Sequence, residues 1–159
     1  MACGVHVSLA MQHPESIQIA DMMTRDPVTV NERTSAARAL ALLTEVGVRH
    51  LPVVDHDRNL VGVISQRDLL AHVGAGGGRR LLASIMQPDV VAVTPDTPAH
   101  EAAYLILHHG IGCIPVIDRD GHLVGIATDA DFVRVAYAAL GGKVPVDERE
   151  LEEKEAASV

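Results

Sequence analysis

The hydrophobic and polar positions of the chain repeat with a shift of 63 residues. When the sequence is aligned with itself at this shift, 17 of the 46 pairs that begin at positions 23 to 68 are identical, and no gap is needed. Self-similarity at a fixed period indicates two copies of one structural unit. A unit of about 60 residues buries little surface by itself, so we expect the two copies to pack into a shared core.

Each copy predicts the order strand, helix, strand, strand, helix. Short runs of β-branched residues bounded by prolines and polar turns are typical of strands, and the helical segments 35–46 and 98–109 are rich in Ala and Leu. The predicted fold class is therefore α/β, with two β-α-β-β-α repeats packed about a pseudo-twofold axis. The predicted strands are 27–30, 50–55 and 60–64 in the first copy and 90–93, 113–118 and 123–127 in the second.

The ends of the first helix in each copy carry recognisable signals. Thr34 and Thr97 stand where a side-chain oxygen caps the first turn. Pro98 follows at the first helical position, where the missing N–H costs nothing. Gly47 and Gly110 predict the ends of the helices, because glycine readily takes the left-handed conformation of a C-terminal cap.

A hydroxyl and an aspartate recur three residues apart at the start of each final helix, as Ser65 with Asp68 and as Thr128 with Asp131. One interpretation is a capping box, although capping boxes prefer Glu or Gln and the shorter Asp reaches back less easily. The other is a ligand site. A helix N-terminus attracts phosphate, and an aspartate one turn later can accept both hydroxyls of a ribose.

Two prolines support the second interpretation. Pro52 and Pro115 cannot donate to a sheet, so we expect their strands to be edges at that point. The backbone of 50–51 and 113–114 is then free to contact the edge of a planar base. A hydroxyl for phosphate, a carboxylate for ribose and open backbone for a base together indicate a nucleotide site.

These motifs resemble the CBS domain, named after cystathionine β-synthase, over residues 19–140. The resemblance implies a tandem pair, or Bateman module, with two clefts between the repeats. In that family the clefts take AMP, ADP, ATP or S-adenosylmethionine as regulatory ligands, no cofactor is required, and binding regulates an attached or partner protein. The stretches that carry the resemblance are "DMMTRDPVTV", "AARALALLTEVGVRHLPVVD" and "NLVGVISQRDLL", then "SIMQPDVVAV", "AHEAAYLILHHGIGCIPVID" and "HLVGIATDADFV".

The resemblance also implies that each cleft is lined by both copies. The hydroxyl would contact phosphate and the aspartate the ribose, while residues before each proline and in the first strand would line the base. The first cleft would combine Ser65, Arg67 and Asp68 with Gln87, Val91, Cys113, Ile114 and Pro115. The second would combine Thr128, Asp129 and Asp131 with Thr24, Val28, His50, Leu51 and Pro52.

Basic residues distinguish the two clefts. Arg67 lies inside the first motif and two arginines follow at 79–80, so a polyphosphate could be neutralised there. The second motif contains Asp129, which would repel phosphate unless Arg49 and His50 offset it. We therefore expect the first cleft to be the tighter anionic site.

The composition of the chain limits the kinds of partner and the cellular location that we expect for it. The 159 residues carry a formal net charge of −8, so the chain lacks the broad basic surface of a nucleic-acid binder. Apolar runs fall well short of the roughly 18 residues of a membrane span. Two cysteines make no disulfide framework, and we expect a cytoplasmic, reducing location.

His108, His109 and Cys113 are the candidates for metal binding or catalysis. Neighbouring helical residues point about 100° apart, so the two histidines do not easily share one ion. Nothing in the sequence orients a histidine toward the thiol. Cys3 and His6 are weaker candidates still, and we expect no metal site and no enzyme.

We expect an N-terminal extension over 1–18, repeats over 19–75 and 82–140, a linker over 76–81 and an acidic tail over 141–159. The predicted function is that of a stand-alone regulatory module that senses an adenosine-containing nucleotide and signals to a protein partner. Its Ala-rich helices predict a homodimer. The alternative is a constitutive dimerisation scaffold that binds no ligand.

Overall fold

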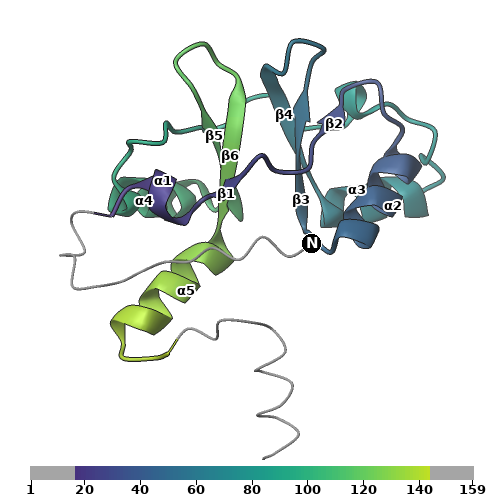
Figure 1. Ribbon diagram of the computed structural model, residues 1–159. Coiled ribbons are helices and arrows are strands. Elements are labelled where there is room, and N and C mark those ends of the chain that lie inside the picture. Colours follow the sequence, from purple (N-terminus) through teal and green to yellow (C-terminus); the bar gives the residue numbers. More distant parts are fainter. Residues whose placement is uncertain (1–16, 144–159) are drawn as a thin grey trace, which may run out of the picture.

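The computed structural model describes residues 17–143 and forms two α/β halves (Figure 1). The predicted extension 1–18, apart from its last two residues, lies outside the described residues, as do Cys3, His6 and the acidic tail beyond 143. Each half contains a three-stranded sheet and helices, so the predicted α/β fold with two related repeats is confirmed.

The first half is built around a sheet in the order β2-β3-β4. Strand β2 runs parallel to β3, and β3 is antiparallel to β4. Helices α2 and α3 pack against each other. The elements of this half are β2 (Val30–Asn31), α2 (Ala36–Val46), β3 (His50–Val54), β4 (Leu60–Ser65), α3 (Gln66–Gly74) and the 3-10 turn η2 (Leu82–Ser84).

The second half has the sheet order β1-β6-β5, with all pairs antiparallel. Helix α5 leaves the end of β6 and extends beyond the rest of the fold, as Figure 1 shows. The elements of this half are α1 (Ile19–Met22), β1 (Thr24–Arg25), α4 (Ala99–His109), β5 (Cys113–Ile117), β6 (Leu123–Thr128) and α5 (Asp129–Ala139).

The start of each repeat belongs spatially to the other half. Strand β1 pairs with β6, placing Thr24 opposite Ile126, and Ile19 and Met22 are buried in the second core. In the same way, Gln87 exchanges two backbone hydrogen bonds with Val63 of β4, at 3.0 and 3.1 Å. The structure therefore has two cores, one in each half, instead of the single shared core expected from the sequence, and each core takes in the initial segment of the other repeat.

Two glycines allow the exchanged segments to lie against the hairpins. A Cβ at Gly125 would lie 2.5 Å from the Met23 sulfur and 3.1 Å from the Thr24 carbonyl oxygen. A Cβ at Gly62 would meet Met86 and the Gln87 carbonyl in the same manner, at 2.6 and 3.0 Å. The glycine in each "LVG" run is thus a position of close backbone approach.

The predicted helix ends are partly confirmed. Gly47 and Gly110 are left-handed C-caps, with φ of 76° and 62°. The predicted N-caps are one residue off, because Ser35 caps α2 by accepting from the Arg38 N–H and Pro98 occupies the N-cap position of α4. The Thr97 hydroxyl instead accepts from the Thr94 N–H, which closes the preceding turn.

The predicted first strands are much shorter than expected. Strand β2 begins only at Val30, and Val93 forms a single bridge to β5. Val93 donates to the Pro115 carbonyl and accepts from the Ile117 N–H. Pairing stops there because Pro115 has no N–H to offer the residues before Val93. Pro115 lies in β5, which is an edge strand of its sheet, as expected. Pro52 lies in β3, which is the central strand of the other sheet, and β2 pairs with β3 only from Val53 onward.

Between residues 17 and 143, no helix has the length and apolar character needed to cross a membrane.

Replacing Gly125 by alanine should destabilise the fold by about 1–3 kcal/mol, because the new methyl group overpacks the contact with Met23 and Thr24. Gly74→Ala is the matched control, since a Cβ there meets open space, and it should leave stability unchanged or slightly raised. Urea denaturation measures both. Equal effects of the two substitutions would show that Gly125 is not a packing constraint.

Candidate functional site

The first hydroxyl–aspartate motif lies where β4 runs directly into α3. Ser65 is the N-cap, and its Oγ accepts from the Asp68 N–H at 3.1 Å. The same hydroxyl donates to Asp68 Oδ2 at 2.5 Å. Arg67 and Asp68 are both exposed. The motif thus presents a hydroxyl, a guanidinium and a carboxylate to solvent at a helix N-terminus.

The second motif, at the start of α5, is a complete capping box. Asp131 Oδ2 accepts from the Thr128 N–H at 2.8 Å and from the Thr128 hydroxyl at 3.0 Å. The expectation that aspartate reaches back poorly is therefore wrong here. Arg134 donates to the other oxygen, Oδ1, at 2.8 Å, and Asp131 is only 7% exposed.

The strand residues of the two predicted groups lie in the opposite hairpins. The register pairs His50 with Ser65 and Cys113 with Thr128, whereas the predicted clefts group His50 with Thr128 and Cys113 with Ser65. The residues of each predicted cleft are therefore not partners in one hairpin. The side chains that precede or include the prolines are buried, namely Leu51, Pro52, Cys113, Ile114 and Pro115.

The exchanged segments place the remaining predicted residues. Gln87 lies beside β4, next to the first motif's hairpin, and Thr24 lies beside β6, next to the second. Each of these two residues therefore lies in the same half as the motif with which it was grouped. Val28 is exposed, whereas Val91 packs against the core of the second half.

The two repeats meet where β3 begins. A Cβ at Gly112 would lie 2.8 Å from the imidazole of His50, so this ring lies against the second repeat. Arg49 Nη2 lies 3.3 Å from Asp129 Oδ1, in an ion pair with both side chains largely exposed. Arg49, one of the two residues that the sequence indicated could offset Asp129, is therefore in contact with it across the two halves.

Burial and charge shift two ionisable groups at this junction. Burial lowers the pKa of His50, and Arg49 lowers it further, while Asp129 and Asp68 raise it by a smaller amount. Burial also raises the pKa of the Cys113 thiol to about 12, with a further contribution from Asp129. Cys113 is therefore protonated at neutral pH and is not an activated nucleophile.

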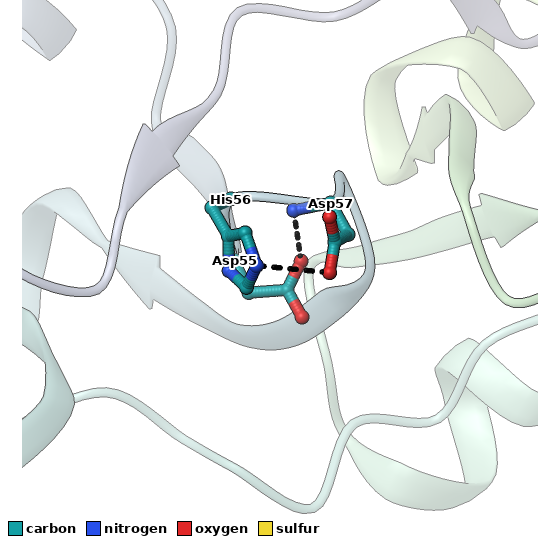
Figure 2. A group of neighbouring side chains, drawn as sticks. All are labelled: Asp55, His56 and Asp57. Atoms are coloured by element: carbon teal, nitrogen blue, oxygen red, sulfur yellow. Dashed lines mark hydrogen bonds and ion pairs between the residues drawn. The ribbon is translucent and has the colours of Figure 1, made fainter.

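Two clusters of potential metal ligands occupy the hairpin turns of the described chain, and the sequence analysis did not single them out. Figure 2 shows one of them, Asp55 with His56 and Asp57. Asp55 Oδ1 accepts from the backbone N–H groups of Asp57 and Asn59, both at 2.9 Å. This carboxylate is therefore already used to close the turn. The other cluster is Asp118, Asp120 and His122.

The residue that the sequence analysis missed is Arg134. It stands one turn after Asp131, and the matching position in the first repeat is Ala71. Oppositely charged residues three apart on a helix are neighbours. That spacing, together with the mismatch between repeats, was the available signal.

The sequence model of the CBS domain family matches residues 19–75 and 82–138. The chain belongs to this family and is a tandem CBS pair. Among curated proteins it is 32% identical, over 117 residues, to a homoserine O-acetyltransferase of Methanohalobium evestigatum. That match covers 74% of this chain but 24% of the relative, so the chain spans about a quarter of such relatives.

Three solved structures share the fold along almost their whole length. A putative acetoin utilization protein of Vibrio cholerae is 38% identical, with a TM-score of 0.71 over 79% of this chain and 93% of its own. CBSX2 of Arabidopsis thaliana, in complex with AMP, is 34% identical, with a TM-score of 0.69 over 77% and 97%. The CBS pair of protein MJ0100, with 5′-methylthioadenosine and S-adenosylmethionine, is 27% identical, with 0.70 over 75% and 98%.

Stability should fall as the pH drops from 7.5 to 5.5. Because the pKa of His50 in the folded chain lies below its ordinary value of 6.5, the unfolded chain takes up this proton first, which favours unfolding. His50→Gln should flatten the dependence in urea denaturation at both pH values. The exposed His56→Gln is the control and should keep the wild-type slope. An unchanged slope in His50→Gln would contradict the assignment.

Proposed function

We propose that the chain is a regulatory module that binds an adenosine-containing nucleotide at its first motif and passes the binding state to a protein partner. The observation that carries the proposal is the exposed carboxylate of Asp68, held beside Ser65 at the N-terminus of α3. Support comes from related CBS pairs that were crystallised with AMP or with S-adenosylmethionine and 5′-methylthioadenosine.

Each group of the first motif has a distinct role in this proposal. The Ser65 hydroxyl and the positive end of the α3 helix dipole bind phosphate, because a helix N-terminus favours negative charge. Arg67 adds a mobile positive charge on the exposed side. Asp68 accepts the ribose hydroxyls. The base lies against Gln87 and Val91 and the strand residues Cys113, Ile114 and Pro115.

The second motif is proposed to bind a nucleotide more weakly or not at all. Its predicted lining comprises Thr128, Asp129 and Asp131 with Thr24, Val28, His50, Leu51 and Pro52. Asp129 is engaged by Arg49, so this arginine neutralises the acid but is not free for phosphate. We place both motifs in a cytoplasmic protein that needs no bound cofactor.

Regulation is proposed to act through the relative position of the two halves. They are joined by the exchanged segments and by the hairpin tips, where the Leu123 N–H donates to the Arg58 carbonyl at 3.2 Å. A ligand that contacts residues of both repeats favours one arrangement over others, and its binding energy supplies the bias. The face that changes is what the partner protein reads.

The proposed assembly is a homodimer formed through the second half. Helices α4 and α5, with the residue that follows α5, expose five large apolar side chains, and we propose that a second copy of the chain covers them. Leu107 and Leu140 are 81% and 87% exposed. The other three are Tyr104, Val133 and Tyr137. Together they leave on the order of 600 Å² to cover, near the roughly 800 Å² per partner of a standard interface.

A thermal-shift panel with AMP, ADP, ATP, S-adenosylmethionine and NAD tests the binding site. A ligand at about 100 times its Kd should stabilise wild type by about 2.7 kcal/mol. Asp68→Ala should lose most of this shift. Asp131→Ala should start about 0.5–2 kcal/mol less stable, because the hydrogen bond from the Thr128 N–H to the Asp131 carboxylate is lost from the capping box, yet should shift as wild type does.

Retention of the full shift by Asp68→Ala would contradict the assignment of the first motif. If none of the five compounds raises the melting temperature of wild type, the result favours the alternative function, a constitutive dimerisation scaffold that binds no ligand. The apolar surface of α4 and α5 is the observation that favours this second candidate.

Placing a charge in the apolar surface should break the dimer. Leu107→Glu puts a carboxylate on the exposed side of α4 that we propose lies in the interface, and desolvating it on association is costly. Light scattering after size exclusion should then report a monomer. Thr44→Glu, at the matching exposed position of α2, is the control and should remain dimeric. A wild-type chain that is already monomeric would refute this assembly.

A further inference from the structure

The carboxylates of the two motifs differ in how much hydrogen-bonding capacity they retain. An ionised carboxylate offers about four lone-pair sites. Asp131 uses three of them, for the Thr128 N–H, the Thr128 hydroxyl and the Arg134 guanidinium. Asp68 accepts one side-chain hydrogen bond, from Ser65. A ribose diol brings two donors, so Asp68 can accept both and Asp131 cannot.

Arg134 accounts for one oxygen of Asp131 by itself. Its Nη1 holds Oδ1, while both Thr128 contacts fall on Oδ2. The Asp131 side chain is 8% exposed in this pair, whereas the Arg134 side chain is 66% exposed. The guanidinium therefore covers the carboxylate from the solvent side, where a sugar would have to approach.

The first repeat has no such cover. The residue that matches Arg134 is Ala71, which is exposed and carries no donor. The two motifs share a hydroxyl N-cap, an aspartate three residues later and the same strand-to-helix transition. Between these two positions they differ, because the second motif has Asp129 and Ala130 where the first has Gln66 and Arg67. The repeats therefore differ in what stands one turn after the aspartate: a guanidinium that donates to Asp131, and a methyl group after Asp68.

We propose that Arg134 is a specificity-determining residue that closes the second motif to adenosine-containing ligands, so that each chain binds one equivalent at Asp68. This inference rests on the proposed function. The Arg134–Asp131 contact need not be a strong ion pair to have this effect. An exposed guanidinium contributes little to folding stability, but a ribose hydroxyl must displace it and leave its charge unpaired near the ligand.

Isothermal titration with AMP, and separately with S-adenosylmethionine, measures the number of equivalents bound per chain. Wild type should bind one. Arg134→Ala should bind two, because Oδ1 of Asp131 is freed. Arg134→Lys keeps a donor at this position and should still bind one. Because the Arg134 side chain is largely exposed, circular dichroism should show that both variants keep the wild-type fold.

The reciprocal exchange makes the test independent of a single substitution. Ala71→Arg places a guanidinium one turn after Asp68 and should weaken the first site at least tenfold. The double variant Ala71→Arg with Arg134→Ala should bind one equivalent that is lost on Asp131→Ala.

Two equivalents in wild type, or one equivalent in folded Arg134→Ala, would overturn the role of Arg134 while leaving the proposed function standing. Absence of binding by wild type and by every variant, with both compounds, would instead remove the proposed function and this inference with it.

Discussion

The exchange of initial segments between the repeats is the constraint on which the rest of the structure depends. Each half takes in a segment of the other repeat: β1 is a strand of the second sheet, the backbone of Gln87 bridges to β4, and Leu82 is buried in the first core. The glycines at 62 and 125 permit this contact. The two half-sized units are thereby joined, and both hydroxyl–aspartate motifs are fixed at strand ends.

In both repeats a hydroxyl at the helix N-cap is followed three residues later by an aspartate. Helix capping and the ligand binding that we propose would therefore compete for one carboxylate. At Asp131 the Thr128 N–H and the Arg134 guanidinium each donate a hydrogen bond to one carboxylate oxygen. The carboxylate can therefore be buried without an unpaired oxygen. At Asp68 the cap is incomplete and the carboxylate stays exposed. Pseudo-symmetry therefore makes the two motifs alike in fold and unlike in chemistry.

The repeat pattern and the glycines at the helix ends predicted the fold, because both signals can be read directly from the sequence. Strand length and partner choice were less predictable. Val93 pairs only where Pro115 allows it, and β1 joins the other repeat's sheet, and both depend on tertiary packing. At the site, the positions of Ser65 and Asp68 followed from sequence. The engagement of Asp131 by Arg134 needed coordinates, although the helical spacing of the pair pointed to it.

A crystal structure of the chain grown with saturating AMP tests the central claim most directly, because it shows which carboxylate holds the ribose. The account predicts one nucleotide per chain, with both ribose hydroxyls on Asp68, the phosphate at the N-terminus of α3, and Asp131 still bound by Arg134. A nucleotide seated on Asp131, or a ribose that contacts neither aspartate, would contradict it.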